Sequence, residues 1–334
     1  MRQITRWFYL LATSISLFVH FARAWVYWKT RARQDLNLPS DQLFSNLAIN
    51  RWRHYFYGTA FLSAVFCQFR GRKINRTESR RFSRLAALAC AFDDLADGLG
   101  HQLDLPKHPE ALGHLLNDNG LALHLLQLVN AEMPSGAMPA FRADLNRVYQ
   151  LEFSGLQQGP QSSEPELALS TKQKGGFSVL LFRRLLGNAP NAVDEALAFE
   201  LGGFVQLCDD IFDSWFDRKN QAPTLAVFFL EKNAPEQLEA IFSDQLAALA
   251  RVIRQMHGTL YRRETTVYAV HFLASITRVC LRHYRQLKKK HGTLPLDDRN
   301  AMVVDMARWQ NQWHTIRALF TPVNLEYLEN EHHN

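Results

Sequence analysis

Four carboxylates interrupt one apolar run, Leu207-Cys208-Asp209-Asp210-Ile211-Phe212-Asp213-Ser214-Trp215-Phe216-Asp217. The apolar approach from Leu201 to Gln206 predicts that the run is helical. Residues at i, i+4 and i+8 share one face of a helix, so Asp209, Asp213 and Asp217 are expected to point the same way. Like charges at this spacing repel one another, and more strongly where water is excluded. A bound cation is therefore expected, and an acidic helix face that simply meets solvent is an equal alternative for this stretch alone.

A second acidic stretch of the same kind lies upstream, Leu88-Ala89-Cys90-Ala91-Phe92-Asp93-Asp94-Leu95-Ala96-Asp97-Gly98. Gly98 and Gly100 are placed to end its helix. Carboxylate oxygens suit Mg²⁺, which keeps several waters and shares the oxygens of substrate phosphates. Two such stretches in one chain are much rarer than one, so the pair favours a metal site over two solvated helix faces.

The two stretches together resemble the motifs of a known family. Phe92 to Asp97 resembles the first aspartate-rich motif, D-D-x-x-D, of the class I terpenoid synthases. Gly203 to Asp213 resembles their second motif, with its G-x-x-x-Q-x-x-D-D lead-in, in the form found in prenyl diphosphate synthases. The resemblance covers roughly residues 40 to 320 and is closest in its logic to bacterial terpene synthases. It implies an all-α fold, a helical bundle around a central apolar cavity, and often a homodimer.

The resemblance also implies a chemistry. Enzymes of this family hold a prenyl diphosphate through three Mg²⁺ ions, for which Mn²⁺ can substitute, and ionise its C–O bond. The departing diphosphate needs its charge neutralised, and the allylic cation needs an apolar, water-poor cavity. The implied metal ligands are Asp93, Asp97, Asp209, Asp213 and Asp217, and the implied catalytic set is Asp93, Asp94, Asp97, Asp209, Asp210 and Asp213.

Residues near the motifs are candidates for binding the diphosphate: Lys172, Lys174, Arg218, Lys219, Arg282 and Tyr284. Lys174 is the first choice, because it lies about 35 residues before Asp209, close to where prenyl diphosphate synthases carry a K-T-x-x-L motif. A lysine ammonium acts on phosphate as a mobile point charge, with an ordinary surface lysine as the alternative. Arg282 and Tyr284 loosely resemble the Arg-Tyr pair of terpene cyclases, although a plain basic helix end is favoured there.

Two departures from the family pattern bear on the number of substrates. Chain-elongating synthases carry an upstream G-G-K-R and an R-R-G after the first motif, which bind isopentenyl diphosphate. Here Gly98-Leu99-Gly100-His101-Gln102 follows the first motif, and no Gly-Gly-Lys-Arg precedes it. We therefore expect a single-substrate terpene synthase. A two-substrate prenyltransferase, of the squalene or phytoene synthase kind or a divergent polyprenyl diphosphate synthase, is the first alternative, and an inactive helical membrane-binding protein is the second.

Composition supports a helical protein with an anionic ligand. The chain has 334 residues, 47% of them hydrophobic, with only 12 Pro and 16 Gly and no alternating strand pattern. The net charge of +6 suits a diphosphate, and the absence of any nucleic-acid-binding signature argues against nucleic acid. We predict an N-terminal helix in residues 1–37, a catalytic domain in 38–325 and a tail in 326–334.

The N-terminus is apolar and basic. Trp7 to Val19 is a 13-residue, mostly apolar run flanked by Arg2, Arg6 and Arg23, shorter than the roughly 20 residues of a spanning helix. An interfacial helix that gives peripheral membrane contact through residues 1–30 is expected. Because Ala22-Arg23-Ala24 has the form of a cleavage site, a secretory signal in residues 1–24 is the alternative. Four isolated cysteines favour a reducing compartment, so a cytoplasmic location is expected.

Overall fold

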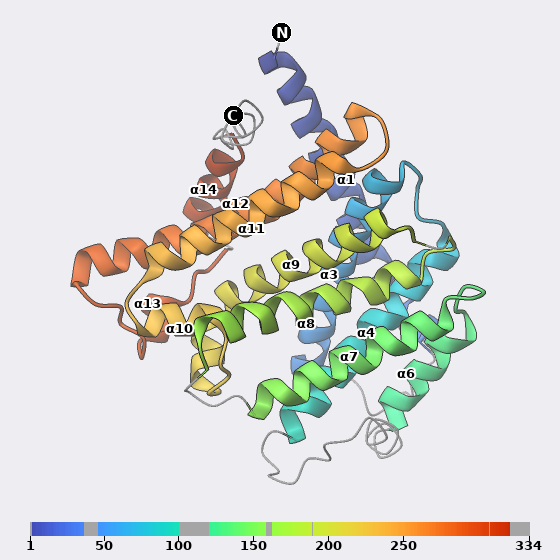
Figure 1. The fold of residues 1–334 in the computed structure, drawn as a ribbon, viewed down its shortest axis with the longest axis horizontal. Coiled ribbons are helices and arrows are strands. Elements are labelled where there is room, and N and C mark those ends of the chain that lie inside the picture. The colour runs from blue at the N-terminus through green and yellow to red at the C-terminus, as the bar shows by residue number, and fades with distance from the viewer. Residues whose placement is uncertain are drawn as a thin grey trace. The chain divides into compact units, whose positions relative to one another are not determined.

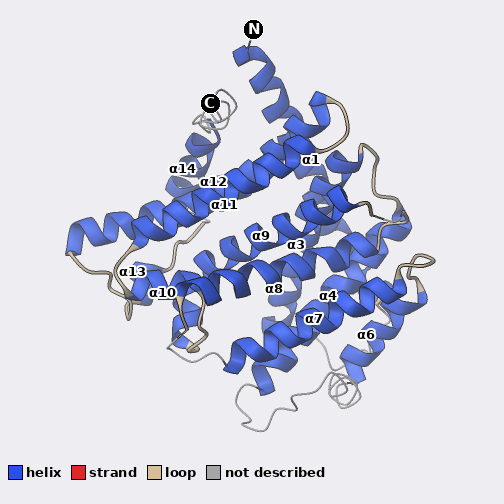
Figure 2. Cartoon of the chain, viewed as in Figure 1, coloured by secondary structure: helices blue, strands red, loops and turns tan. Residues whose placement is uncertain are grey.

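The structure is a computed structural model that describes residues 2–36, 46–99, 120–157, 162–188, 190–306 and 308–320. Every regular element in these ranges is a helix, and none of them is a strand (Figure 2). The predicted all-α class is therefore confirmed for this part of the chain. The predicted domain start at residue 38 and the predicted tail at 326–334 lie outside the described residues.

Spatial contacts divide the chain into two compact units, which we describe separately. Unit 1 comprises Met1–Gln206 and Ala247–Ala269, and unit 2 comprises Leu207–Leu246 and Val270–Asn334. The helices that lie wholly in unit 1 are α1 (Arg2–Thr30), α2 (Ala32–Asp35), α3 (Asn46–Arg70), α4 (Arg76–Leu99), α6 (Gly120–Ala131), α7 (Met138–Gln157) and α8 (Glu164–Arg184), labelled in Figure 1. Helices that contribute residues to both units are α9 (Ala192–Lys219), α11 (Pro235–Gln255) and α12 (Leu260–His291), and those wholly in unit 2 are α10 (Leu225–Glu231), α13 (Arg299–Met302) and α14 (Trp309–Phe320).

The core of unit 1 forms where successive helices pack. Neighbouring pairs include α1 with α3, α3 with α4, α4 with α6, and α7 with α8. On α4, Phe82, Leu85 and Leu88 recur at helical spacing, and all are at most 3% exposed. The Phe82 ring meets Phe66 of α3 and Phe182 of α8 edge-on, at centroid distances of 6.2 and 5.2 Å. This apolar stripe anchors α4, whose C-terminal end carries the first acidic motif.

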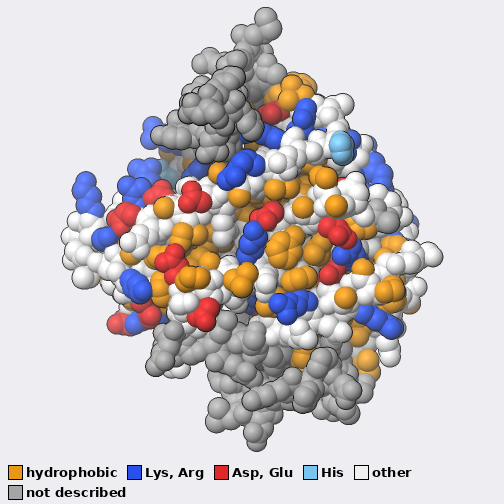
Figure 3. All heavy atoms as spheres, in the orientation of Figure 1, with side chains coloured by type: hydrophobic (Ala, Val, Ile, Leu, Met, Phe, Trp, Pro, Cys, Tyr) orange, Lys and Arg blue, Asp and Glu red, His pale blue; other side chains and the backbone are white. Residues whose placement is uncertain are grey.

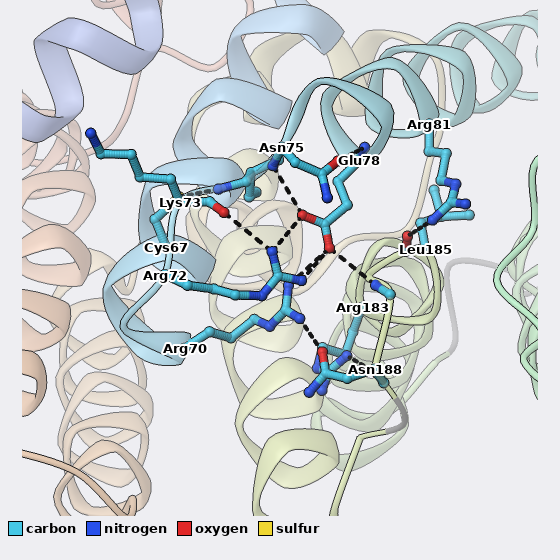
Figure 4. Close-up of polar contacts among 12 residues, drawn as sticks. Cys67, Arg70, Arg72, Lys73, Asn75, Glu78, Arg81, Arg183, Leu185 and Asn188 are labelled. Carbon is cyan, nitrogen blue, oxygen red and sulfur yellow. Dashed lines mark hydrogen bonds and ion pairs between the residues drawn. The ribbon is translucent and has the colours of Figure 1, made fainter.

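A buried carboxylate, Glu78 in the first turn of α4, holds the α3–α4 and α8–α9 connections together (Figure 4). Its side chain is 1% exposed and forms ion pairs with Arg70 and Arg72. It also accepts hydrogen bonds from the backbone N–H of Asn75, at 3.1 Å, and of Gly187, at 3.0 Å. Burial alone raises the pKa of Glu78, but the donors, with Arg72 first, outweigh it and lower the pKa to about 2.

We predict that Glu78→Gln lowers the free energy of unfolding by about 3 kcal/mol near neutral pH, because two guanidinium groups lose their carboxylate. Since the folded-state pKa is depressed from 4.5 to about 2, this stabilisation is complete above about pH 4.5 and is lost as the pH falls toward 2. Urea denaturation of both proteins at about pH 7 and about pH 3 measures it. The exposed Glu164→Gln on α8 is the matched control, and a wild-type advantage that does not shrink at the lower pH would contradict the assignment.

Candidate metal and diphosphate site

The second acidic motif lies on α9, which is one uninterrupted helix from Ala192 to Lys219. Asp209 and Asp213 are exposed and Asp217 is partly exposed, whereas Asp210 is only 5% exposed. The exposure pattern agrees with the predicted common face for the residues at i, i+4 and i+8. It also separates Asp210 from the others, because its side chain lies on the buried side of the helix.

The buried side of α9 is fastened to α12 within unit 2. The Tyr284 hydroxyl donates a hydrogen bond to the Ile211 carbonyl at 3.0 Å, which leaves it to accept one from the Ser214 hydroxyl, also at 3.0 Å. The Cys208 thiol is buried and hydrogen-bonded to the Thr277 side chain, and burial raises the pKa of the thiol. These contacts fix the rotation of α9 about its own axis, and with it the direction in which Asp209 and Asp213 point.

Tyr284 was predicted to contact diphosphate, but the structure places it in the core. Its side chain is 2% exposed, and burial raises the pKa of its phenol. A diphosphate oxygen could reach the hydroxyl only if Tyr284 gave up its bonds to α9. The geometry therefore gives no support to a binding role for Tyr284, whereas Arg282, two residues earlier on α12, is exposed.

The first acidic motif lies at the C-terminal end of α4, in unit 1. Helix α4 is described as far as Leu99, and Gly100, the second glycine predicted to end it, lies outside the described residues. Asp93 is partly exposed, and one of its carboxylate oxygens accepts a hydrogen bond from the Tyr55 hydroxyl of α3 at 2.9 Å. Asp94 and Asp97 belong to the same helix, but their side chains lie outside the described part of the structure. Tyr55 orients Asp93, and no motif distinguishes it in the sequence from the other aromatics of α3.

Helices α8 and α9 touch through their backbones at a pair of glycines. A Cβ atom built on Gly202 would lie 2.1 Å from the Gly175 carbonyl oxygen, and one built on Gly175 would lie 2.1 Å from the Gly202 carbonyl oxygen. Only glycine permits so close an approach. This crossing brings the lysine-bearing turn of α8 directly against the helix that carries the second motif (Figure 1).

Both predicted diphosphate-binding lysines of α8 form ion pairs within unit 1. Lys172 lies 2.8 Å from Glu200 of α9, and Lys174 lies 2.9 Å from Glu152 of α7. Lys and Arg side chains lie beside Asp and Glu side chains in several places on the face that Figure 3 shows. Partly exposed pairs of this kind contribute about 0–1 kcal/mol, so either lysine could exchange its carboxylate for a phosphate at little cost. Sequence reasoning missed both glutamates, because no local pattern marks them as partners.

The two cations that follow the second motif have partners in unit 2. Arg218 lies 2.7 Å from Asp297 and 3.2 Å from Glu231, and the hydrogen bond to Asp297 is the main reason that its pKa is raised. The Lys219 ammonium lies 5.4 Å from the centroid of the Trp215 ring. Arg218 therefore braces the end of α9 in this structure, and its part in diphosphate binding remains a prediction.

The exposed side chains of α9 fit a hard cation. Asp209 and Asp213 offer only oxygen donors, one helical turn apart, as Mg²⁺ prefers. Among the residues with described side chains, no three His, Cys, Asp or Glu converge on one point. The joining of the two acidic motifs remains a prediction.

Comparison with known proteins adds no relative. No protein-family model matches the sequence, and neither the curated proteins nor the solved structures include a significant match. The resemblance to class I terpenoid synthases therefore rests on the acidic motifs, their order and their separation.

We predict that Gly202→Ala lowers the free energy of unfolding by about 3 kcal/mol, because the new methyl group would overlap the Gly175 carbonyl and force α8 and α9 apart. Gly58→Ala is the matched control, since a Cβ at this position in α3 meets nothing within 4 Å. The control should be neutral or stabilising by about 0.5–1 kcal/mol, from helix propensity alone. Thermal and urea unfolding measure both, and equal effects would contradict the backbone contact.

Proposed function

We propose that the protein is a Mg²⁺-dependent class I terpene synthase that ionises a single prenyl diphosphate and releases diphosphate. The observation that carries the proposal is the arrangement of α9. Asp209 and Asp213 are exposed on a helix whose opposite side is locked in place by Tyr284 and Ser214. Ligands held on a rigid helix are what a preorganised metal site requires. Charge repulsion along this face is relieved when a cation binds.

The proposed ligands for the metal are Asp93 and Asp97 of α4 and Asp209, Asp213 and Asp217 of α9. Mg²⁺ bound there would neutralise the charge that develops on the departing diphosphate. Tyr55 orients the Asp93 carboxylate through its hydrogen bond. In the proposed fold these helices belong to a bundle around a central apolar cavity, which excludes water from the allylic cation.

Lys172 and Lys174 are the proposed diphosphate ligands of α8. In the absence of substrate each ammonium is paired, with Glu200 and Glu152 respectively. On binding, each would turn from its glutamate to a phosphate oxygen, which carries more charge. The glutamates would release the lysines readily, because partly exposed ion pairs of this kind are weak.

Two alternatives differ from the proposal in a measurable way. A two-substrate prenyltransferase needs a second diphosphate site, for which the chain lacks the Arg-Arg-Gly expected after Asp97. An inactive scaffold needs no metal and would tolerate loss of its carboxylates. We further propose that the protein is cytoplasmic, because prenyl diphosphates and Mg²⁺ occur together in the cytoplasm. We also propose that it contacts a membrane surface and that it pairs as a homodimer, as the family resemblance implies.

The test of the proposal is an assay of the purified full chain with Mg²⁺ and farnesyl or geranylgeranyl diphosphate, with and without isopentenyl diphosphate. The expected result is a hydrocarbon or alcohol from one substrate, identified by mass spectrometry, with release of diphosphate. A longer diphosphate formed only with the second substrate would establish the prenyltransferase. Release of no diphosphate under any of these conditions would favour the scaffold.

We predict that Asp209→Asn and Asp210→Asn act differently. Asp209→Asn removes an exposed ligand and should lower kcat/KM at least about 100-fold with little change in stability. Asp210→Asn alters a buried carboxylate and should lower the free energy of unfolding by about 1–3 kcal/mol, with the smaller effect on metal dependence. The exposed Asp244→Asn on α11 is the matched control. Equal loss of activity in both variants, at equal stability, would refute the division of roles.

A further inference from the structure

Helix α1 presents a stripe of large apolar side chains to the outside. Trp7, Leu11, Ile15, Phe18, Trp25 and Val26 are among the exposed residues of this stripe, with Phe18 the most exposed at 72%. The first four are three or four residues apart, and Trp25 lies seven residues, or about two turns, after Phe18, so the stripe follows one side of the helix for most of its length. An apolar stripe of this length is unusual on the surface of a soluble monomer and marks an interaction surface.

The opposite side of α1 is packed against the rest of unit 1. Leu10 and Leu17 are buried, and the Thr13 hydroxyl donates a hydrogen bond to the Thr265 carbonyl of α12 at 3.3 Å. Near the other end, the Trp28 ring lies 5.0 Å from the Phe56 ring of α3. The segment Trp7–Thr30 is long and apolar enough to cross a membrane. A crossing helix, however, would have to leave these contacts, because lipid surrounds it on all sides.

The first turn of α12 continues the apolar surface beside α1. Leu260 and Tyr261 are 57% and 46% exposed. The Tyr261 ring lies 6.1 Å from the Phe8 ring and 5.9 Å from the Tyr9 ring, centroid to centroid. The apolar surface thus comes from two helices that hold each other in place, so it exists before any partner binds.

The charged side chains of α1 itself all have one sign. Residues 2–33 contain no Asp or Glu, and the exposed cations Arg23, Lys29 and Arg31 lie toward the C-terminal end of α1. A second copy of the same helix would bring cations against cations, and neither helix carries an acidic residue to pair them. An anionic bilayer offers an acyl boundary against which the apolar stripe can pack. Its headgroups offer phosphate oxygens that can pair with the cations.

We propose that α1 lies flat in the headgroup region of an anionic bilayer, with its apolar stripe and Leu260–Tyr261 at the acyl boundary and its inner face still packed on α3. Trp7 and Trp25 then lie at the interface, where indole rings are favoured. The protein is monotopic in this arrangement, neither spanning the membrane nor losing α1 as a signal. The inference rests on unit 1 alone and stands or falls independently of the proposed enzyme activity.

Flotation of the purified full chain with vesicles tests the proposal. Wild type should float with vesicles that contain phosphatidylglycerol and bind less to pure phosphatidylcholine or at high salt. Ile15→Glu places a charge in the stripe at a residue that is 56% exposed, and should lower vesicle binding about tenfold or more. Leu169→Glu on α8, at 55% exposure, is the matched control and should bind as wild type does. No vesicle binding by wild type, or equal binding by all three proteins, would overturn the proposal.

Two further measurements, the depth of α1 in the bilayer and the oligomeric state of the protein, test a spanning helix and a second copy of the chain as alternatives. The extra tryptophan of Ile15→Trp should be quenched most by lipids brominated near the headgroup. Leu169→Trp, which adds a tryptophan away from the stripe, is the control for quenching of the native tryptophans. Strongest quenching by bromines near the bilayer centre would mean that α1 spans the membrane and would overturn a flat orientation. Light scattering without lipid should show the same mass for wild type and Ile15→Glu. A dimer that only Ile15→Glu dissociates would show that a second copy covers the stripe.

Discussion

The proposed chemistry depends on one constraint, that α9 can neither rotate nor slide while it carries like charges one turn apart. Its N-terminal half is set by backbone contact between Gly202 and Gly175 and by the pair of Glu200 with Lys172. Its C-terminal half is set by the hydrogen bonds of Tyr284 and Ser214. Repulsion between exposed carboxylates could otherwise be relieved by a turn of the helix toward water. We propose that a cation bound by Asp209 and Asp213 relieves this repulsion.

Buried and partly exposed ion pairs have different roles in this structure. Glu78 is buried among two guanidinium groups and two backbone amides, and its pKa is lowered to about 2, so it stays ionised and holds the helix connections of unit 1. Lys172 and Lys174 form partly exposed pairs that can exchange partners cheaply. The buried network gives rigidity, and the weak pairs are the ones that we propose a diphosphate would replace.

Sequence periodicity predicted what depends on local spacing. The helical state of both acidic stretches and the common face of Asp209 and Asp213 follow from residue order along one helix. Partners distant in sequence could not be predicted, because periodicity does not encode which helices meet. Tyr55 on Asp93 and Glu152 on Lys174 are of this kind. Tyr284 resembled a ligand by its neighbours in sequence, but its helical position turns it into the core.

The central claim is that the two acidic motifs bind metal together. Electron paramagnetic resonance of Mn²⁺, titrated into the full chain with inorganic diphosphate, tests it most directly through a cycle of Asp93→Asn, Asp209→Asn and the double variant. Shared ions predict that each single variant loses nearly as much affinity as the double variant. Additive losses in free energy of binding, or ions that remain bound in the double variant, would contradict the account.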